Sequence, residues 1–240
     1  MPNPTAAMLV IGDEILSGRT RDANMHFLAG ELTKHGVDLR EVRIVSDDRN
    51  AIIAAVNALR AAHDYVVTSG GIGPTHDDIT ADCIAAAFGV GIDVRDDARD
   101  LLQAHYDRQG SELNAARLRM ARIPEGATLI DNPVSVAPGF IIGNVHVMAG
   151  VPSVFQAMVA SVLPTFVGGA PLLSQTLRID RGEGDIAGPL AELAADYPDL
   201  SIGSYPFQKN GAFGANIVIR GTDGAQIDAA MSRLHGIFSE

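Results

Sequence analysis

The chain has one cysteine and few basic residues for its size. Cys83 has no second thiol to pair with, which excludes an intramolecular disulfide and a cysteine-rich metal site. The 18 lysines and arginines stand against 29 aspartates and glutamates, so the formal charge is −11 over 240 residues. Nucleic acids and anionic membrane surfaces attract basic patches, and we therefore expect neither as the main partner.

Charged side chains are also missing from one long segment, which extends from Asn132 to Leu177. Pro138, Pro152 and Pro164 interrupt it, and no apolar run reaches the roughly 18 residues of a membrane span. The segment therefore predicts buried core with tight turns. The N-terminal residues lack the basic start and apolar run of a signal peptide, which favours a cytoplasmic protein.

Hydrophobic periodicity predicts that the chain has two parts, which differ in the order of their helices and strands. In the first, strands at 7–12, 37–45 and 64–69 alternate with helices, which is typical of a parallel sheet covered on both faces. Further helices are expected at 96–109, 113–122 and 151–166, and further strands at 127–130, 139–142 and 145–148. After the break at 168–171 the order becomes strand, helix, two hairpin strands and helix. The predicted fold is an α/β domain over 1–168 and a small α+β subdomain over 172–240.

The most informative stretch follows the third strand and reads Ser69-Gly70-Gly71-Ile72-Gly73-Pro74-Thr75-His76-Asp77-Asp78. Three glycines let the backbone approach a ligand closely, and their N–H groups, with the next helix N-terminus, favour phosphate. No Gly-Lys-Ser/Thr follows, so this is not a Walker loop, and it lacks the dinucleotide fingerprint. The alternative is a sharp loop in which Asp78 or Thr80 only caps the helix. His76 is either a metal or phosphate ligand or a surface residue.

Acidic loops follow the first two strands as well, at Gly12–Gly18 and at Ser46-Asp47-Asp48. The carboxyl ends of parallel strands meet at one edge of the sheet, which is where ligands bind in open α/β folds. Acidic groups beside a phosphate site are expected to hold a divalent cation between themselves and the phosphate. Taken alone, Asp47 would be a helix cap. The turn Gly150-Val151-Pro152-Ser153 provides either amide donors or a tight connection.

Taken together and in order, these motifs resemble a known family. With Asn24, Pro124–Ala127, Asn132-Pro133 and Ala137–Phe140, they are similar to the MoaB/Mog molybdopterin-binding-like domain. Within this family, the motifs resemble the branch seen in the N-terminal half of the competence/damage-inducible protein CinA. The form Gly-Pro-Thr-His-Asp-Asp, with Ser204-Tyr205-Pro206 in the tail, also resembles eukaryotic FAD synthase.

The resemblance implies a three-layer α/β/α domain that forms homo-oligomers. It places the catalytic acidic positions on Asp47 and Asp78, with Asp22 as a third position. The CinA branch is credited with metal-dependent hydrolysis of ADP-ribose, the FAD synthase branch with FAD hydrolysis, and the Mog branch with binding and adenylylation of molybdopterin. Ile72 replaces the threonine of the Mog loop, and Ala149 replaces the proline of the second turn, so adenylyl transfer is less favoured here.

The preferred hypothesis is therefore a divalent-metal-dependent pyrophosphohydrolase of an ADP-ribose- or FAD-type substrate. The alternatives are molybdopterin binding or adenylylation, and a non-catalytic nucleotide or pterin-binding module. The metal is expected to be Co, Mg or Mn, held by Asp47 and Asp78 with Asp13 and Asp77 as secondary ligands. The residues expected to bind the ligand are Gly12, Ser17, Gly18, Asn24, Ser69, Gly70, Gly71, Gly73, Thr75, Gly150, Pro152 and Ser153.

Overall fold

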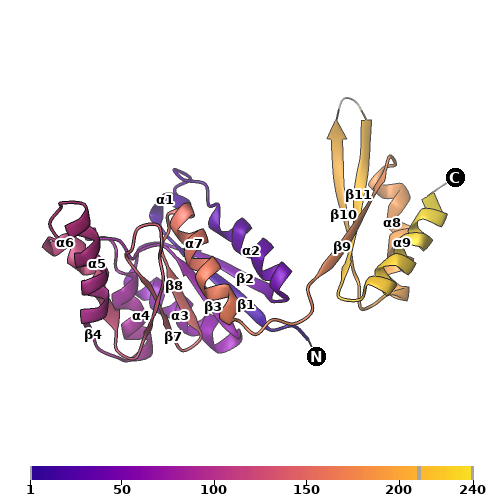
Figure 1. The fold of residues 1–240 in the computed structure, drawn as a ribbon. Coiled ribbons are helices and arrows are strands. Elements are labelled where there is room, and N and C mark those ends of the chain that lie inside the picture. The colour runs from indigo at the N-terminus through magenta and orange to yellow at the C-terminus, as the bar shows by residue number, and fades with distance from the viewer. Residues whose placement is uncertain (1, 210–211, 239–240) are drawn as a thin grey trace. The chain divides into compact units, whose positions relative to one another are not determined.

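The computed structural model describes residues 2–209 and 212–238, and the chain divides into two compact units, 1–169 and 170–240 (Figure 1). The larger unit contains β1 (Thr5–Ile11), α1 (Asp13–Leu16), α2 (Asn24–His35), β2 (Asp38–Val45), α3 (Arg49–Ala62), β3 (Tyr65–Ser69), α4 (Thr80–Phe88), β4 (Ile92–Val94), α5 (Asp96–Arg108), α6 (Ala115–Leu118), the 3-10 turn η1 (Arg119–Ala121), β5 (Arg122–Pro124), β6 (Thr128–Ile130), β7 (Gly139–Ile142), β8 (Val145–Met148), α7 (Pro152–Val162) and the 3-10 turn η2 (Leu163–Thr165).

A six-stranded sheet of order β2-β1-β3-β8-β7-β6 forms the centre of this unit. Its first four strands are parallel, and β7 and β6 are antiparallel additions at one edge. Among the described residues, no helix is both long and apolar enough to span a membrane. The mostly parallel α/β fold predicted from periodicity is confirmed.

Helices cover both faces of the sheet (Figure 1), and the side chains of β1 alternate between the two cores that result. Ala7, Leu9 and Ile11 belong to a core with residues of α3, α4 and α5. Ala6, Met8 and Val10 belong to a second core with residues of α2 and α7. Successive side chains of a strand point to opposite faces, so a continuously apolar strand is buried on both. The three-layer α/β/α architecture follows directly.

The helix predicted at 113–122 is wrong in its second half. Asn114 caps α6 by accepting from the N–H of Arg117 at 3.0 Å, but the helix ends at Leu118. Residues 122–124 instead form β5, which pairs with β4. Tertiary pairing overrides local helix propensity here, because Ile123 is buried against the domain core.

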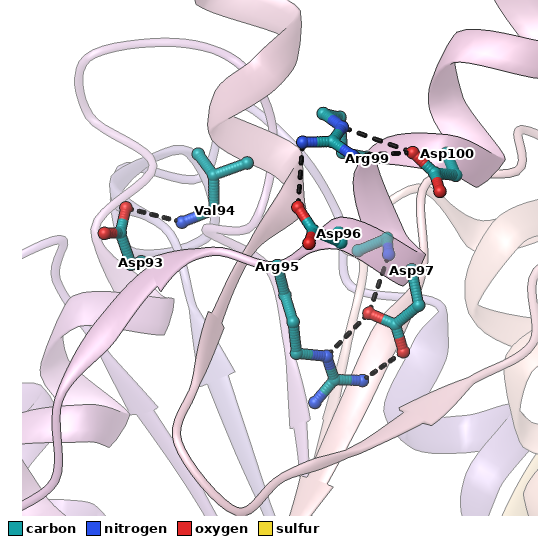
Figure 2. Close-up of polar contacts among 8 residues, drawn as sticks. Asp93, Val94, Arg95, Asp96, Asp97, Arg99 and Asp100 are labelled. Carbon is teal, nitrogen blue, oxygen red and sulfur yellow. Dashed lines mark hydrogen bonds and ion pairs between the residues drawn. The ribbon is translucent and has the colours of Figure 1, made fainter.

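A dense group of acidic residues lies around the start of α5 (Figure 2). Arg95 donates to both carboxylate oxygens of Asp97, at 2.7 and 2.9 Å, and Arg99 contacts Asp96 and Asp100. Carboxylates in a first helical turn are favourable because the N-terminus carries partial positive charge. These exposed ion pairs stabilise a helix end, and none of their residues lines the cleft described below.

The smaller unit contains β9 (Leu173–Ile179), α8 (Glu183–Asp196), β10 (Ser201–Lys209), β11 (Ala212–Gly221) and α9 (Gly224–Phe238). Its antiparallel sheet has the order β10-β11-β9. Ile217 and Ile219 of the sheet share a core with Leu193 of α8 and Leu234 of α9. The element order is the one predicted, and the hairpin strands are longer than their apolar alternation indicated.

Candidate functional site: a cleft at the strand ends

A cleft of about 800 Å³ opens at the carboxyl ends of the parallel strands. The loops after β1, β2, β3 and β8 all contribute to it, as the parallel topology requires. Its size lies in the range of small-molecule sites, roughly 300–1,000 Å³. Ten of the residues expected at the site line it, namely Gly12, Asp47, Gly70, Gly71, Gly73, Asp77, Asp78, Gly150, Pro152 and Ser153.

Six expected residues lie outside the lining. They are Asp13, Ser17, Gly18, Asn24, Ser69 and Thr75. Asn24 and Ser69 are almost fully buried, so they position neighbouring groups rather than face a ligand. Ser17 and Gly18 close the exposed turn after α1.

The glycine-rich loop is held so that several of its amides have no protein partner. Gly70 has φ +109° and Gly71 φ +69°, conformations that side-chain-bearing residues rarely adopt. The N–H of Gly70 donates to the carbonyl of Met148 at 3.1 Å. Among the described residues, the amides of Gly71, Ile72 and Gly73 donate no hydrogen bond. These three N–H groups are therefore available to a ligand in the adjoining cleft.

Asp47 is not the cap of the following helix, contrary to the interpretation from its position alone. Asp48 has that role and accepts from the N–H of Ala51 at 2.8 Å. The carboxylate of Asp47 instead accepts from the N–H of Asp13 at 3.0 Å and lines the cleft. Partial burial raises the pKa of Asp47 above its ordinary value, and the nearby carboxylates of Asp13, Glu14 and Asp77 add to this effect.

Asp78 and Thr80 do not cap α4 either. The helix begins after Ile79, with no side-chain cap. The carboxylate of Asp78 turns back and accepts from the N–H and hydroxyl of Thr75, at 2.8 and 2.5 Å. The hydroxyl of Thr80 donates to the carbonyl of Gly70 at 3.0 Å. Both side chains therefore fix the loop, and Asp78 remains at the cleft wall.

Asn24 joins the two turns that form the cleft floor. Its amide nitrogen donates to the hydroxyl of Ser69 and to the carbonyl of Gly150, each at 2.8 Å. Gly150 packs so closely on Gly70 that a Cβ built on it would lie 3.2 Å from the Gly70 Cα. The turn before α7 is therefore both a tight connection and part of the site. The first turn of α7 has no side-chain cap, and Ser153 and Val154 line the cleft there.

The apolar part of the lining was not predicted from sequence. Ile72, Met120, Val134, Ala137 and Val151 form it, and Asn132 and Ser135 add polar groups. Four of these residues belong to the 132–137 loop, whose Asn-Pro and Ala-Pro pairs are among the motifs that resemble the family.

The side chain of Asn132 holds this loop in shape. It is buried, donates to the hydroxyl of Ser135 and the carbonyl of Ala137, and accepts from the amides of Val134 and Ser135. Val136 has φ +66°, which is unfavourable for a β-branched residue. A strained backbone held by a buried amide side chain indicates a rigid wall.

The charged side chains in the cleft lining all have the same sign. Among the described residues, the cleft is lined by the carboxylates of Glu14, Asp47, Asp77 and Asp78 and by no basic or aromatic side chain. His76, by contrast, is almost fully exposed on the outside of the loop. Cys83 is buried on α4, where burial raises the pKa of its thiol to about 11, so it is not a nucleophile.

Within the described ranges, no three His, Cys, Asp or Glu side chains converge into a preformed metal cage. A hard cation such as Mg²⁺ is commonly bound by one or two carboxylates together with substrate phosphates and water. Asp47 and Asp78 could provide such carboxylates, since both line the cleft.

Comparison with known proteins assigns the domain that contains this cleft to a family. Residues 7–168, which include the glycine-rich loop, match the model of a probable molybdopterin binding domain. The chain belongs to this molybdopterin-binding domain family. The resemblance expected from the motifs is thereby confirmed. Residues 171–240 match the model of the FAD synthase middle domain, so the tail of this family member has a known counterpart as well.

Proteins similar to this chain include FAD synthases and CinA-like proteins. The chain is 34% identical over 261 residues to a probable FAD synthase of Caenorhabditis elegans, with 98% of this chain and 50% of the relative covered. It is 38% identical over 167 residues to a CinA-like protein of Citrifermentans bemidjiense, covering 68% of this chain and 40% of the relative. The chain thus spans half, or less, of the length of these relatives.

A solved structure supports the fold assignment. The crystal structure of the protein CinA from Thermoplasma acidophilum, a protein described as having unknown function, aligns with a TM-score of 0.63 and 34% identity. The alignment covers 68% of this chain and 98% of that protein. The molybdopterin-binding-like architecture of the larger unit is therefore shared with an experimental CinA structure.

Proposed function

We propose that the chain is a divalent-metal-dependent pyrophosphohydrolase that cleaves nucleotide diphosphate-linked substrates of the ADP-ribose or FAD type. The observation that carries the proposal is the pairing of unpartnered loop amides with carboxylates in a cleft without a basic side chain among its described residues. A diphosphate beside four carboxylates is repelled unless a cation lies between them. The FAD synthase and CinA relatives support this choice of substrate.

The residues have distinct roles in this proposal. The amides of Gly71, Ile72 and Gly73 bind phosphate oxygens and stabilise the charge that develops during attack. Asp47 and Asp78 would hold the cation, with Asp13 and Asp77 as secondary ligands; when bound, it would neutralise the diphosphate and polarise the reacting phosphoryl group.

Water supplies the attacking oxygen. A new bond forms between this oxygen and one phosphorus, and the bridging P–O bond breaks, so that AMP and the second phosphate ester leave. Glu14 lines the cleft and would orient the water and take up its proton. The aliphatic wall of Val134 and Val151 would contact the nucleotide's ring and exclude bulk water from one side.

Incubation of the chain with ADP-ribose or FAD and Mg²⁺, Mn²⁺ or Co²⁺ tests this function. We expect release of AMP, measured by liquid chromatography. Asp78→Ala is expected to lower turnover by about 100-fold or more, the scale on which loss of one key charge-stabilising group acts. Asp100→Ala removes an exposed carboxylate outside the cleft and is the matched control. Absence of AMP with every metal would refute the hydrolase, and unchanged turnover in Asp78→Ala would refute the site.

Molybdopterin binding or adenylylation is the second candidate, because the family model that matches is described by molybdopterin binding. It predicts a pterin that remains with the purified chain, or release of pyrophosphate from ATP when molybdopterin is added. Retained pterin without any turnover would favour a non-catalytic binding module. A homo-oligomer in the cytoplasm remains our expectation for the assembly, and light scattering measures its size.

A further inference from the structure

Arg119 contacts the end of the glycine-rich loop but does not line the cleft described above. It begins η1, 41 residues after Asp78, and its Nη2 donates to the main-chain carbonyl of Asp78 at 3.2 Å. Its Nε is buried and has no hydrogen-bond partner among the described residues. A buried donor without a hydrogen-bond partner is unfavourable, so its presence calls for a reason.

The neighbouring Arg122 shows that the environment of Arg119 is unusual. Arg122 makes a bidentate pair with Asp82, with both distances 2.7 Å. Over the described part of the chain, no carboxylate lies within ion-pair distance of Arg119. A guanidinium keeps its charge in proteins, so Arg119 places beside the loop a positive charge that has no direct ion-pair partner among the described residues.

Arg119 and the loop line one small cavity of about 20 Å³. Its lining includes Gly71, Ile72 and Gly73 of the loop and Arg119 with Met120, together with the charged residues Asp78, Asp82 and Arg122. This volume suffices for about one water molecule. The same three residues carry the unpartnered amides, so Arg119 and the proposed phosphate donors line one small cavity.

We propose that Arg119 is a positioning residue for phosphate binding. Its hydrogen bond to the Asp78 carbonyl fixes the end of the loop, and its charge strengthens the attraction of the Gly71–Gly73 amides for an anion. Together with the proposed cation, this charge would help an acidic cleft, whose lining has no basic side chain among the described residues, to attract phosphate. The inference rests on the proposed function, because it assumes that the loop binds phosphate.

The experiment compares the binding of AMP with that of adenosine, measured by titration calorimetry with Mg²⁺ present. The phosphate is the only difference between these probes. Arg119→Met is expected to weaken AMP binding about tenfold or more and to leave adenosine binding unchanged. Arg119→Lys keeps the charge and loses the fork of donors, so it should recover part of the AMP affinity. Arg117→Met is the matched control, since the guanidinium of Arg117 lies on the ring of Tyr106.

The outcomes separate the positioning role from a structural one and from the proposed function. Equal loss of AMP and adenosine binding would mean that Arg119 only supports the fold, and unchanged AMP binding would overturn the inference outright. A wild-type chain that binds AMP but hydrolyses neither ADP-ribose nor FAD would refute the hydrolase while leaving Arg119 testable. A wild-type chain that binds no AMP would overturn the phosphate cradle and the role of Arg119 together.

Discussion

Gly70 offers the sharpest test of how rigidly the loop is held. In Gly70→Ala the new Cβ would lie 2.3 Å from the main-chain oxygen of Ile11, far inside contact distance. The backbone also has φ +109°, which side-chain-bearing residues rarely adopt. Strain of about 1–2 kcal/mol from the left-handed backbone and about 1–3 kcal/mol from overpacking together predict a loss of about 2–5 kcal/mol in unfolding free energy.

Gly18→Ala is the matched control for this prediction. Gly18 has φ +72°, but nothing lies within 4 Å of a Cβ built there. Gly18→Ala therefore has backbone strain but no steric clash. Both substitutions also stabilise the protein equally by reducing the conformational entropy of the unfolded chain. Their difference comes mainly from the contact with Ile11, to which the larger φ of Gly70 adds, and should be about 1–3 kcal/mol.

Urea unfolding of both variants, followed by circular dichroism, measures this difference. AMP binding should also fall in Gly70→Ala, since the Cβ displaces the loop that carries the free amides. Equal destabilisation by the two substitutions would refute the reasoning, because the loop would then move away from Ile11 at no cost. Unchanged AMP affinity in Gly70→Ala would show that the loop position does not determine phosphate binding.

Three further predictions concern residues in and around the cleft. Because the pKa of Asp47 is raised in the folded state, its ionised form is less favourable there than in the unfolded chain. Asp47→Asn should therefore raise stability slightly near pH 7 while abolishing turnover, and the gain should disappear as the pH falls below the ordinary pKa of 3.8. Asn24→Ala loses two buried hydrogen bonds and should cost about 1–3 kcal/mol in urea unfolding, whereas Asn57→Ala on the exposed face of α3 should cost far less. Val136→Gly relieves the positive φ and should leave the thermal midpoint unchanged or higher, whereas Val134→Gly, where φ is not positive, should lower it; a fall in both would contradict the strain at Val136.

Much of the architecture was predictable because it depends on patterns that repeat along the chain. The apolar run of β1 requires burial on both faces, and strands that alternate with helices require parallel pairing. The convergence of the loops at 12, 47 and 70–78 follows from that topology. The β4–β5 ribbon was not predictable, since its strands are three residues long and are stabilised only by each other and the core.

The sequence by itself determined the family, the α/β fold and the glycines that expose the loop amides, because these depend on residue type and order. Only the tertiary structure decided what each polar side chain does. Asp47 and Asp48 are chemically identical neighbours, yet Asp48 caps α3 and Asp47 faces the cleft, because the N–H of Asp13 lies beside one of them. Arg119 and the wall at 132–137 join the site from segments far along the chain. A pattern along a sequence specifies local backbone and burial, but the partner of a polar group is chosen by whatever the fold brings within hydrogen-bond distance.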